Sequence, residues 1–219
     1  MNEFISDYWV FWAGSLIIII GAIVLIRFQR GAWKKVFSEF AESHVFKINK
    51  EKVSLDEDLQ YLNESVQVGG YTPVLSAIKG EYDRKNFRLY YTNYGILCAI
   101  KSNSTQNKRI IIVNQKEKLN WKMFVKSGVI TFVRGMKKIE GFLPEFNEKY
   151  KVYARNNVRS IINEEVQKTI INYDSSIPIV IDISQGVITI RTKRLQTMSE
   201  INTVFELSFQ IVNAFEKNK

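Results

Sequence analysis

The two side-chain types that most often carry catalysis, cysteine and histidine, are nearly missing from this sequence. The chain has 219 residues but only one cysteine, Cys98, and one histidine, His44. A single cysteine excludes an intramolecular disulfide and a cysteine-based zinc cage. Cys98 lies in the apolar segment Ile96–Ile100, where a cysteine ordinarily serves as a small buried hydrophobe. His44 follows an expected helix end, where it would be a surface or helix-dipole partner.

Motifs for nucleotide binding, zinc hydrolysis and serine hydrolysis are also missing from the sequence. We therefore expect no catalytic residue, no metal ligand and no cofactor.

Carboxylates are the remaining groups that could do acid–base chemistry. Glu164 and Glu165 are neighbours in an expected helix, so their side chains point about 100° apart and do not converge. Asp182 interrupts an apolar strand, and by alternation it faces the opposite side from Ile181 and Ile183. A hydrolase that depends on carboxylates and leaves no motif stays open as an alternative, and it requires a deep pocket with converging acids.

Positive charge is a further signal, with 31 Lys+Arg against 22 Asp+Glu and a formal net charge of +9. The basic residues form small groups rather than a continuous stripe, so we do not expect nucleic-acid binding. A solvated surface is the ordinary interpretation. The more specific interpretation is contact with anionic lipid, where each basic residue near the surface contributes about 1 kcal/mol to binding. The candidate residues for lipid or partner contact are Trp33, Lys34, Lys35, Phe37, Arg84, Lys85 and Arg88.

An uncharged apolar run from Tyr8 to Ile26 dominates the start of the chain. At a rise of about 1.5 Å per residue it covers roughly 28 Å, close to the thickness of a hydrocarbon core. The run predicts a transmembrane helix over residues 8–26. A buried helix and a cleaved signal peptide are the alternatives. A signal peptide begins with positive charge, whereas here Glu3 and Asp7 precede the run and Arg27 follows it.

The same charges predict an orientation. No basic residue precedes the run, and Arg27, Arg30, Lys34 and Lys35 follow it. The positive-inside rule then places residues 1–7 outside as a short tail and the rest in the cytoplasm. We therefore expect a single-pass protein of the cell membrane, with a cytosolic domain.

Residues 27–44 are expected to form a separate amphipathic helix beside the membrane. Its apolar side chains recur at helical spacing at Trp33, Val36, Phe37, Phe40 and Ala41. This stripe could lie on lipid or dock on the domain, and docking is the commoner fate of such a stripe.

Residues 45–219 are expected to form one α+β domain, a mainly antiparallel sheet with packed amphipathic helices. A weak internal boundary is possible near residues 141–149. Expected helices cover Leu55–Val66, a segment from Asn156 or Asn157 to Ile170, and Ile201–Phe215 after a cap at Ser199. Alternating segments predict strands over Val74–Lys79, Phe87–Thr92, Ile96–Ser102, Arg109–Asn114, Asn120–Lys126, Val129–Arg134, Ile177–Ile183 and Val187–Thr192, the last two joined by a three-residue turn at 184–186.

The C-terminal part carries a pattern of aromatic, helical and hairpin segments. Phe142 and Phe146 precede Tyr150–Tyr153, and a helix, a hairpin around Gly186 and a closing helix follow. Over about residues 140–217 this resembles uncharacterised prokaryotic membrane-associated domains of unknown function. The resemblance implies a fold and a membrane association but no chemical role for any residue.

Together these features favour a binding or scaffolding module at the membrane surface rather than an enzyme. Its expected partners are the membrane and an unknown protein. The alternatives are a subunit of a larger membrane complex, which would use the Trp33–Ala41 stripe as its contact, and the carboxylate-dependent hydrolase.

Overall fold

We describe the protein from a computed structural model of the whole chain. The described residues are 2–49, 55–59, 74–92, 95–102, 109–114, 135–156, 158–173, 177–192, 195 and 197–217. The expected strands at 120–126 and 129–134, and the expected helix beyond Leu59, lie outside these ranges.

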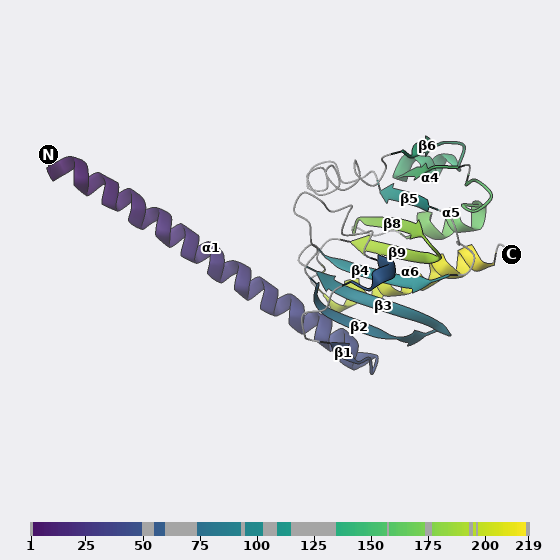
Figure 1. The fold of residues 1–219 in the computed structure, drawn as a ribbon, viewed down its shortest axis with the longest axis horizontal. Coiled ribbons are helices and arrows are strands. Elements are labelled where there is room, and N and C mark those ends of the chain that lie inside the picture. Colours follow the sequence, from purple (N-terminus) through teal and green to yellow (C-terminus); the bar gives the residue numbers. More distant parts are fainter. Residues whose placement is uncertain are drawn as a thin grey trace.

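Within these ranges nine strands form one central sheet, and every paired neighbour in it is antiparallel. Across the sheet the strand order is β1-β2-β3-β4-β9-β8-β5-β7-β6 (Figure 1). The expected α+β class with a mainly antiparallel sheet is therefore found. The strands are β1 (Ile48–Asn49), β2 (Val74–Tyr82), β3 (Lys85–Thr92), β4 (Ile96–Lys101), β5 (Arg109–Asn114), β6 (Lys137–Ile139), β7 (Tyr150–Ala154), β8 (Ile179–Ser184) and β9 (Val187–Thr192).

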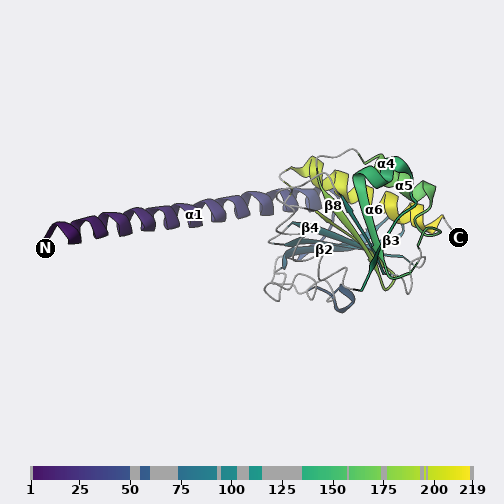
Figure 2. The same cartoon turned by 90° about the horizontal axis from the view of Figure 1, so that it is seen from above.

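The α-helices gather on one face of this sheet, and a short 3₁₀ helix lies on the other, as Figure 2 shows. The helices are α1 (Asn2–Ser43), η1 (Glu57–Leu59), α4 (Pro144–Lys149), α5 (Glu164–Ile171) and α6 (Met198–Glu216). On the helix-covered side, strand residues such as Ile181 and Ile190 pack against helix residues such as Phe205 and Ile211 in one apolar core. Burial of this aliphatic and aromatic surface is the main driving force for the fold.

The expected membrane-spanning helix over residues 8–26 is wrong. Within the described ranges, no helix has the combination of length and apolar character needed to cross a bilayer. Three predictions depended on this span and are therefore wrong as well. They are the single-pass location in the cell membrane, the outside tail and the cytosolic domain.

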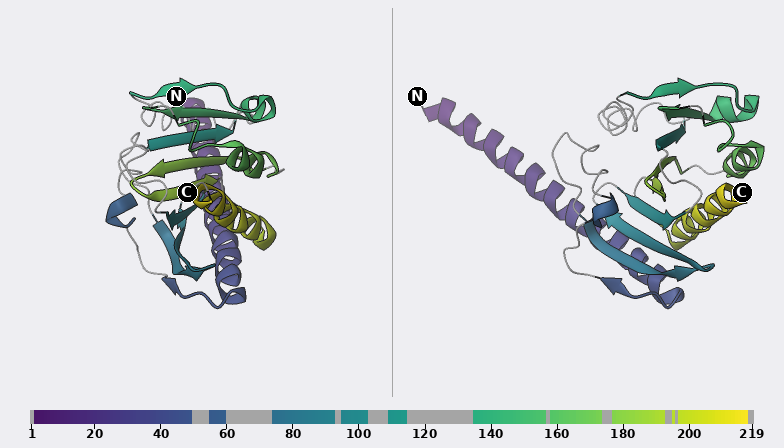
Figure 3. Two further views of the ribbon diagram at one scale, coloured as in Figure 1. Left: turned by 90° about the vertical axis from the view of Figure 1, so that its right-hand side faces the viewer. Right: turned by 45° about the vertical axis from the view of Figure 1, so that its right-hand side comes forward.

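Residues 2–43 instead form one continuous helix of 42 residues, not a span and a separate amphipathic helix. The sequence between Asn2 and Ser43 contains no proline, the residue that most strongly breaks a helix. The N-terminal part of α1 projects away from the sheet, as Figure 3 shows.

The C-terminal end of α1 docks on the domain, which resolves the alternative left open by the sequence. Phe37, Phe40 and Ala41 are buried, and Trp33 and Val36 pack against the same core. The rings of Phe40 and Phe205 of α6 lie 5.3 Å apart in an edge-to-face arrangement. The Trp33–Ala41 stripe is therefore used inside this chain and is not an outer contact.

Three local expectations need correction. The hairpin between β8 and β9 turns over two residues, because Ser184 pairs with Val187 and both Gln185 and Gly186 have positive φ. Helix α5 begins at Glu164 with Asn163 as its cap, later than Asn156. Helix α6 is capped by Thr197, whose hydroxyl accepts from the Glu200 amide while the Glu200 side chain accepts from the Thr197 amide.

Candidate functional site

The sheet face opposite the described α-helices carries charged side chains together with a second apolar cluster around Leu59 and Ile111. Asp182 of β8 pairs in register with Thr189 of β9 on one side and with Ile111 of β5 on the other. Following the same register to both edges gives one row of residues that share this face. From edge to edge the row is Lys79, Arg88, Ala99, Thr189, Asp182, Ile111, Tyr153 and Lys138.

Asp182 lies at the centre of this row and is fully buried, with 0% of its surface exposed. Neither of its carboxylate oxygens accepts a hydrogen bond from the described residues. Burial raises the pKa of Asp182 to about 6, although the positive charges of Arg191 and Arg109 act in the opposite direction. Alternation correctly predicted its face, but it could not show that this face is covered.

Arg109 and Arg191 flank Asp182 from the two neighbouring strands. Arg109 pairs with Ser184 and Arg191 with Val180, so each arginine is diagonal to Asp182. Diagonal positions are about 7–8 Å apart, within reach of a long side chain. The register places the buried carboxylate of Asp182 between two partly buried arginines.

A second polar cluster joins η1 to the sheet. Arg88 Nη1 and Nη2 donate to the two carboxylate oxygens of Asp58 at 2.6 and 2.8 Å, and Nη1 also donates to Asp56 at 3.1 Å. Lys79 Nζ donates to Asp56 at 2.8 Å. The hydrogen bond from Arg88 lowers the pKa of Asp58. Burial works against ionisation of Asp56, but hydrogen bonds from Lys79 and Arg88 outweigh it and lower its pKa too.

The basic residues predicted for lipid or partner contact are not gathered on one surface. Lys85 Nζ donates to Glu216 Oε2 at 2.6 Å, and Arg88 is held by the two aspartates. Arg84 lies in the turn between β2 and β3 with positive φ. On α1, Lys34 and Lys35 are exposed, and Lys35 lies 3.8 Å from Glu39. Contact through Lys34, Lys35 and Arg84 stays a prediction.

Trp33 and Phe37, the two apolar residues predicted for lipid or partner contact, pack against the domain core. Phe37 is 1% exposed and its ring lies 5.6 Å from the ring of Tyr91 of β3, so it belongs to the core. Trp33 is partly buried against the same core.

Cys98 and His44 have the structural surroundings that the sequence indicated. Cys98 is buried on β4, and burial raises its thiol pKa to about 12 against a hydrogen bond with Ser208. A thiol of that pKa is a poor nucleophile near neutral pH. The Nδ1 atom of His44 lies 3.0 Å from the carbonyl of Phe40, and its ring stacks on Phe46 at 5.4 Å. Among the described residues, no group of three His, Cys, Asp or Glu could hold a metal ion.

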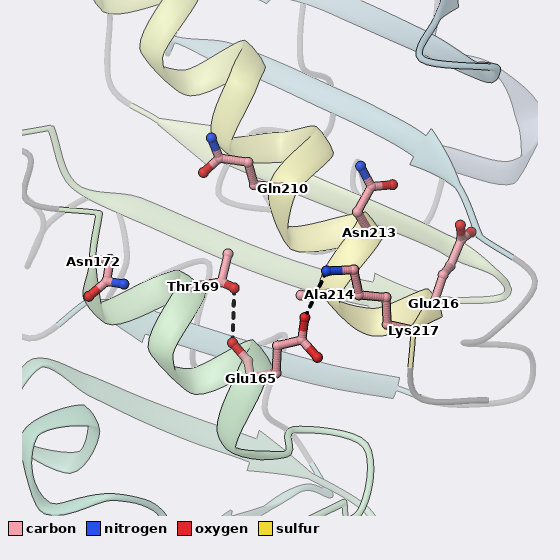
Figure 4. A pocket seen from close by; sticks show the side chains of 8 residues that line it. All are labelled: Glu165, Thr169, Asn172, Gln210, Asn213, Ala214, Glu216 and Lys217. Carbon is pink, nitrogen blue, oxygen red and sulfur yellow. Dashed lines mark hydrogen bonds and ion pairs between the residues drawn. The ribbon is translucent and has the colours of Figure 1, made fainter.

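An open groove of about 690 Å³ runs between α5 and α6. Figure 4 shows that Lys217, which follows α6, reaches across one part of it to Glu165 of α5. The two charged groups are 3.1 Å apart. The other acid of the groove, Glu216, is paired with Lys85. Both acids are neutralised by lysines, so the groove does not bring free carboxylates together. Its lining is Glu165, Thr169, Asn172, Gln210, Asn213, Ala214, Glu216 and Lys217.

The projecting part of α1 carries the largest exposed apolar surface of the described residues. Eight large apolar side chains between positions 12 and 24 are 47–73% exposed, whereas only Val45 and Met198 are comparable elsewhere in the described ranges. We call residues 12–24 the apolar arm. Its members with large exposed side chains are Trp12, Leu16, Ile17, Ile18, Ile19, Ile20, Ile23 and Val24. Sequence reasoning found this run but assigned it to a membrane span.

Comparison with known proteins gives a likeness of fold. The crystal structure of the mycobacterial trehalose monomycolate transport factor A, TtfA, is similar with a TM-score of 0.61 and 10% sequence identity. The match covers 84% of this chain and 94% of that chain. No family model and no curated protein matches the sequence. The resemblance of residues 140–217 to membrane-associated domains therefore stays a prediction, and the comparison supports a shared architecture alone.

Proposed function

We propose that this chain is a non-enzymatic subunit of a larger assembly and that the apolar arm is its attachment helix. The observation that carries the proposal is the concentration of exposed large apolar side chains on that one segment. Soluble monomers seldom expose contiguous apolar patches larger than a few hundred Å². A helix that is apolar on all its faces is normally buried.

The arm has enough surface for a stable attachment. Fully burying one Leu or Ile side chain contributes about 1.5–3 kcal/mol. The arm offers eight large apolar side chains that are about half to three-quarters exposed. Covering them therefore gives a gross gain on the order of 10 kcal/mol before the cost of association.

The partner surface that fits the arm is apolar and protein-derived, such as a groove between helices. Phe37, Phe40 and Ala41 are buried at the domain end of α1, and the arm belongs to the same continuous helix. A preformed helical arm loses less conformational entropy on binding than a flexible tail would.

The arrangement of acids supports a binding role over a hydrolytic one. Asp182 is covered, Asp56 and Asp58 are held by Arg88, and Glu165 is held by Lys217. A general acid or base must reach the reacting group of a substrate. The fold neighbour bears the name of a transport factor, but fold does not determine function, so the proposal stands on α1.

The test compares the native size of the assembly from wild-type chain and from Ile17→Gln/Ile18→Gln/Ile20→Gln. Size-exclusion of native extracts should show wild type in a complex much larger than its own 25.5 kDa, and the triple variant at monomer size. Val45→Asn is the matched control, because it removes an exposed apolar side chain outside the arm and should leave the complex intact. A wild-type chain of monomer size would contradict the proposal. Flotation of the purified chain with protein-free liposomes, lost in the triple variant, would also contradict it, because the arm would then bind lipid.

A further inference from the structure

We propose that the apolar arm pairs with the arm of a second copy of this chain, antiparallel, about a two-fold axis between Ile17 and Ile18. This inference rests on the proposed function and names one partner of the attachment helix. A two-fold contact of this kind is self-complementary and closes at two copies.

Two glycines mark the face for this contact. Gly14 and Gly21 are seven residues apart, so they lie within about 20° of each other around the helix. A Cβ atom built on either one meets nothing within 4 Å. Without side chains there, a second helix can approach the backbone closely, and helix spacing depends on the side chains at the contact.

The spacing of these glycines sets the register of an antiparallel pair. The point midway between them is between Ile17 and Ile18, so rotation about that point places Gly14 opposite Gly21 of the second copy. Ile17 and Ile18 lie on either side of the line joining the glycines, and they are 70% and 73% exposed. Across the two-fold axis each would meet its own equivalent.

Charge along the helix favours the antiparallel orientation. The sequence has two acids, Glu3 and Asp7, and no base before position 27. Arg27, Arg30 and Lys34 then follow within the same helix. An antiparallel pair places the acidic end of one helix beside the basic end of the other. A parallel pair places like charges side by side, which is unfavourable.

The same register keeps the two domains apart. Trp33 is the first described side chain of α1 that packs against the domain core. About an axis between positions 17 and 18 it lies opposite position 2 of the second copy, so the two domains lie at opposite ends of the pair. One partner helix covers one side of the arm, which leaves its other sides to further components.

Distance measurement on the full purified chain tests this pairing. A nitroxide label at Lys34→Cys is suitable because Lys34 is exposed, whereas the native Cys98 is buried and stays unlabelled. In the antiparallel pair the two labels are separated by 33 helical residues, about 50 Å. A parallel pair would place them less than about 20 Å apart, and that result would overturn the inference.

Glycine variants provide the matched comparison. Gly14→Leu/Gly21→Leu should abolish the 50 Å distance and return the chain to a monomer by sedimentation. Gly31→Leu is the control, because Gly31 is equally open but lies about 80–100° away from the glycine face. All three substitutions replace a helical glycine with a better helix former, so loss of folding is not expected. A monomeric wild-type chain that still enters a large native complex would overturn this inference and leave the proposed function standing.

Discussion

The buried carboxylate of Asp182 makes stability depend on pH in an unusual direction. Burial raises its pKa in the folded protein to about 6, from an ordinary value of 3.8. Below about pH 4 the carboxyl is protonated in both folded and unfolded chains. Between about pH 4 and 6 the folded chain holds a proton that the unfolded chain has lost, so the free energy of unfolding decreases as pH rises. The decrease is about 3 kcal/mol in total and is complete above pH 6, because one pKa unit corresponds to about 1.4 kcal/mol.

Asp182→Asn tests this reasoning, since the amide has nearly the same shape and does not ionise. We expect the free energy of unfolding of the variant, relative to that of wild type, to be up to about 3 kcal/mol higher at pH 7.5 than at pH 4. Urea unfolding of the full chain at both pH values, in a mild non-ionic detergent that covers the apolar arm, measures this difference. Other carboxylates titrate alike in both proteins, so the difference isolates Asp182.

Asp58→Asn is the matched control with the opposite sign. Hydrogen bonding from Arg88 lowers the pKa of Asp58 in the folded state, so its stabilisation is present above pH 4 and is lost as pH falls. This variant should be less stable than wild type at pH 7.5. A difference between Asp182→Asn and wild type that stays constant from pH 4 to pH 7.5 would refute the account of Asp182.

Two further substitutions test the contacts that join the outer elements to the sheet. Arg88→Leu should lower the free energy of unfolding by about 1–3 kcal/mol, measured by urea unfolding, because it leaves Asp56 and Asp58 without their shared donor; a change below 0.5 kcal/mol would show that the cluster is dispensable. Phe40→Ala should cost about 3–5 kcal/mol by the same measurement and should speed proteolysis near the end of α1, since Phe40 is fully buried against Phe205. Equal cleavage rates in variant and wild type would contradict docking of α1.

Features that depend on local periodicity were predictable from the sequence. The spacing of Phe37, Phe40 and Ala41 indicated docking on the domain, and these residues are buried there. Alternation gave most of the described strands, because successive side chains of a strand face opposite sides. The class of the fold followed from the order of these segments.

Features that depend on distant parts of the chain were not predictable in the same way. The start of α5 was misplaced because Val158 and Ile162 recur at helical spacing and are buried, although both precede the cap at Asn163. The pairing of Arg88 with Asp58 joins residues 30 positions apart, so no local pattern reveals it. The apolar arm was recognised as apolar, but its continuity with the docked end of α1 depends on the whole helix.

The surroundings of Asp182 were likewise predictable only where they depend on the local sequence. Sequence reasoning singled out Asp182 as an acid within an apolar strand, but the two arginines beside it come from β5 and β9. Their proximity follows from strand order, which single-strand patterns do not determine.

The mass of the native particle that contains this chain tests the central claim most directly. Native mass spectrometry after gentle release from detergent should give a mass well above that of a single 25.5 kDa chain, with protein components that dissociate in Ile17→Gln/Ile18→Gln/Ile20→Gln. A wild-type mass of one chain alone, unchanged by these substitutions, would contradict the assignment of the apolar arm as an attachment helix.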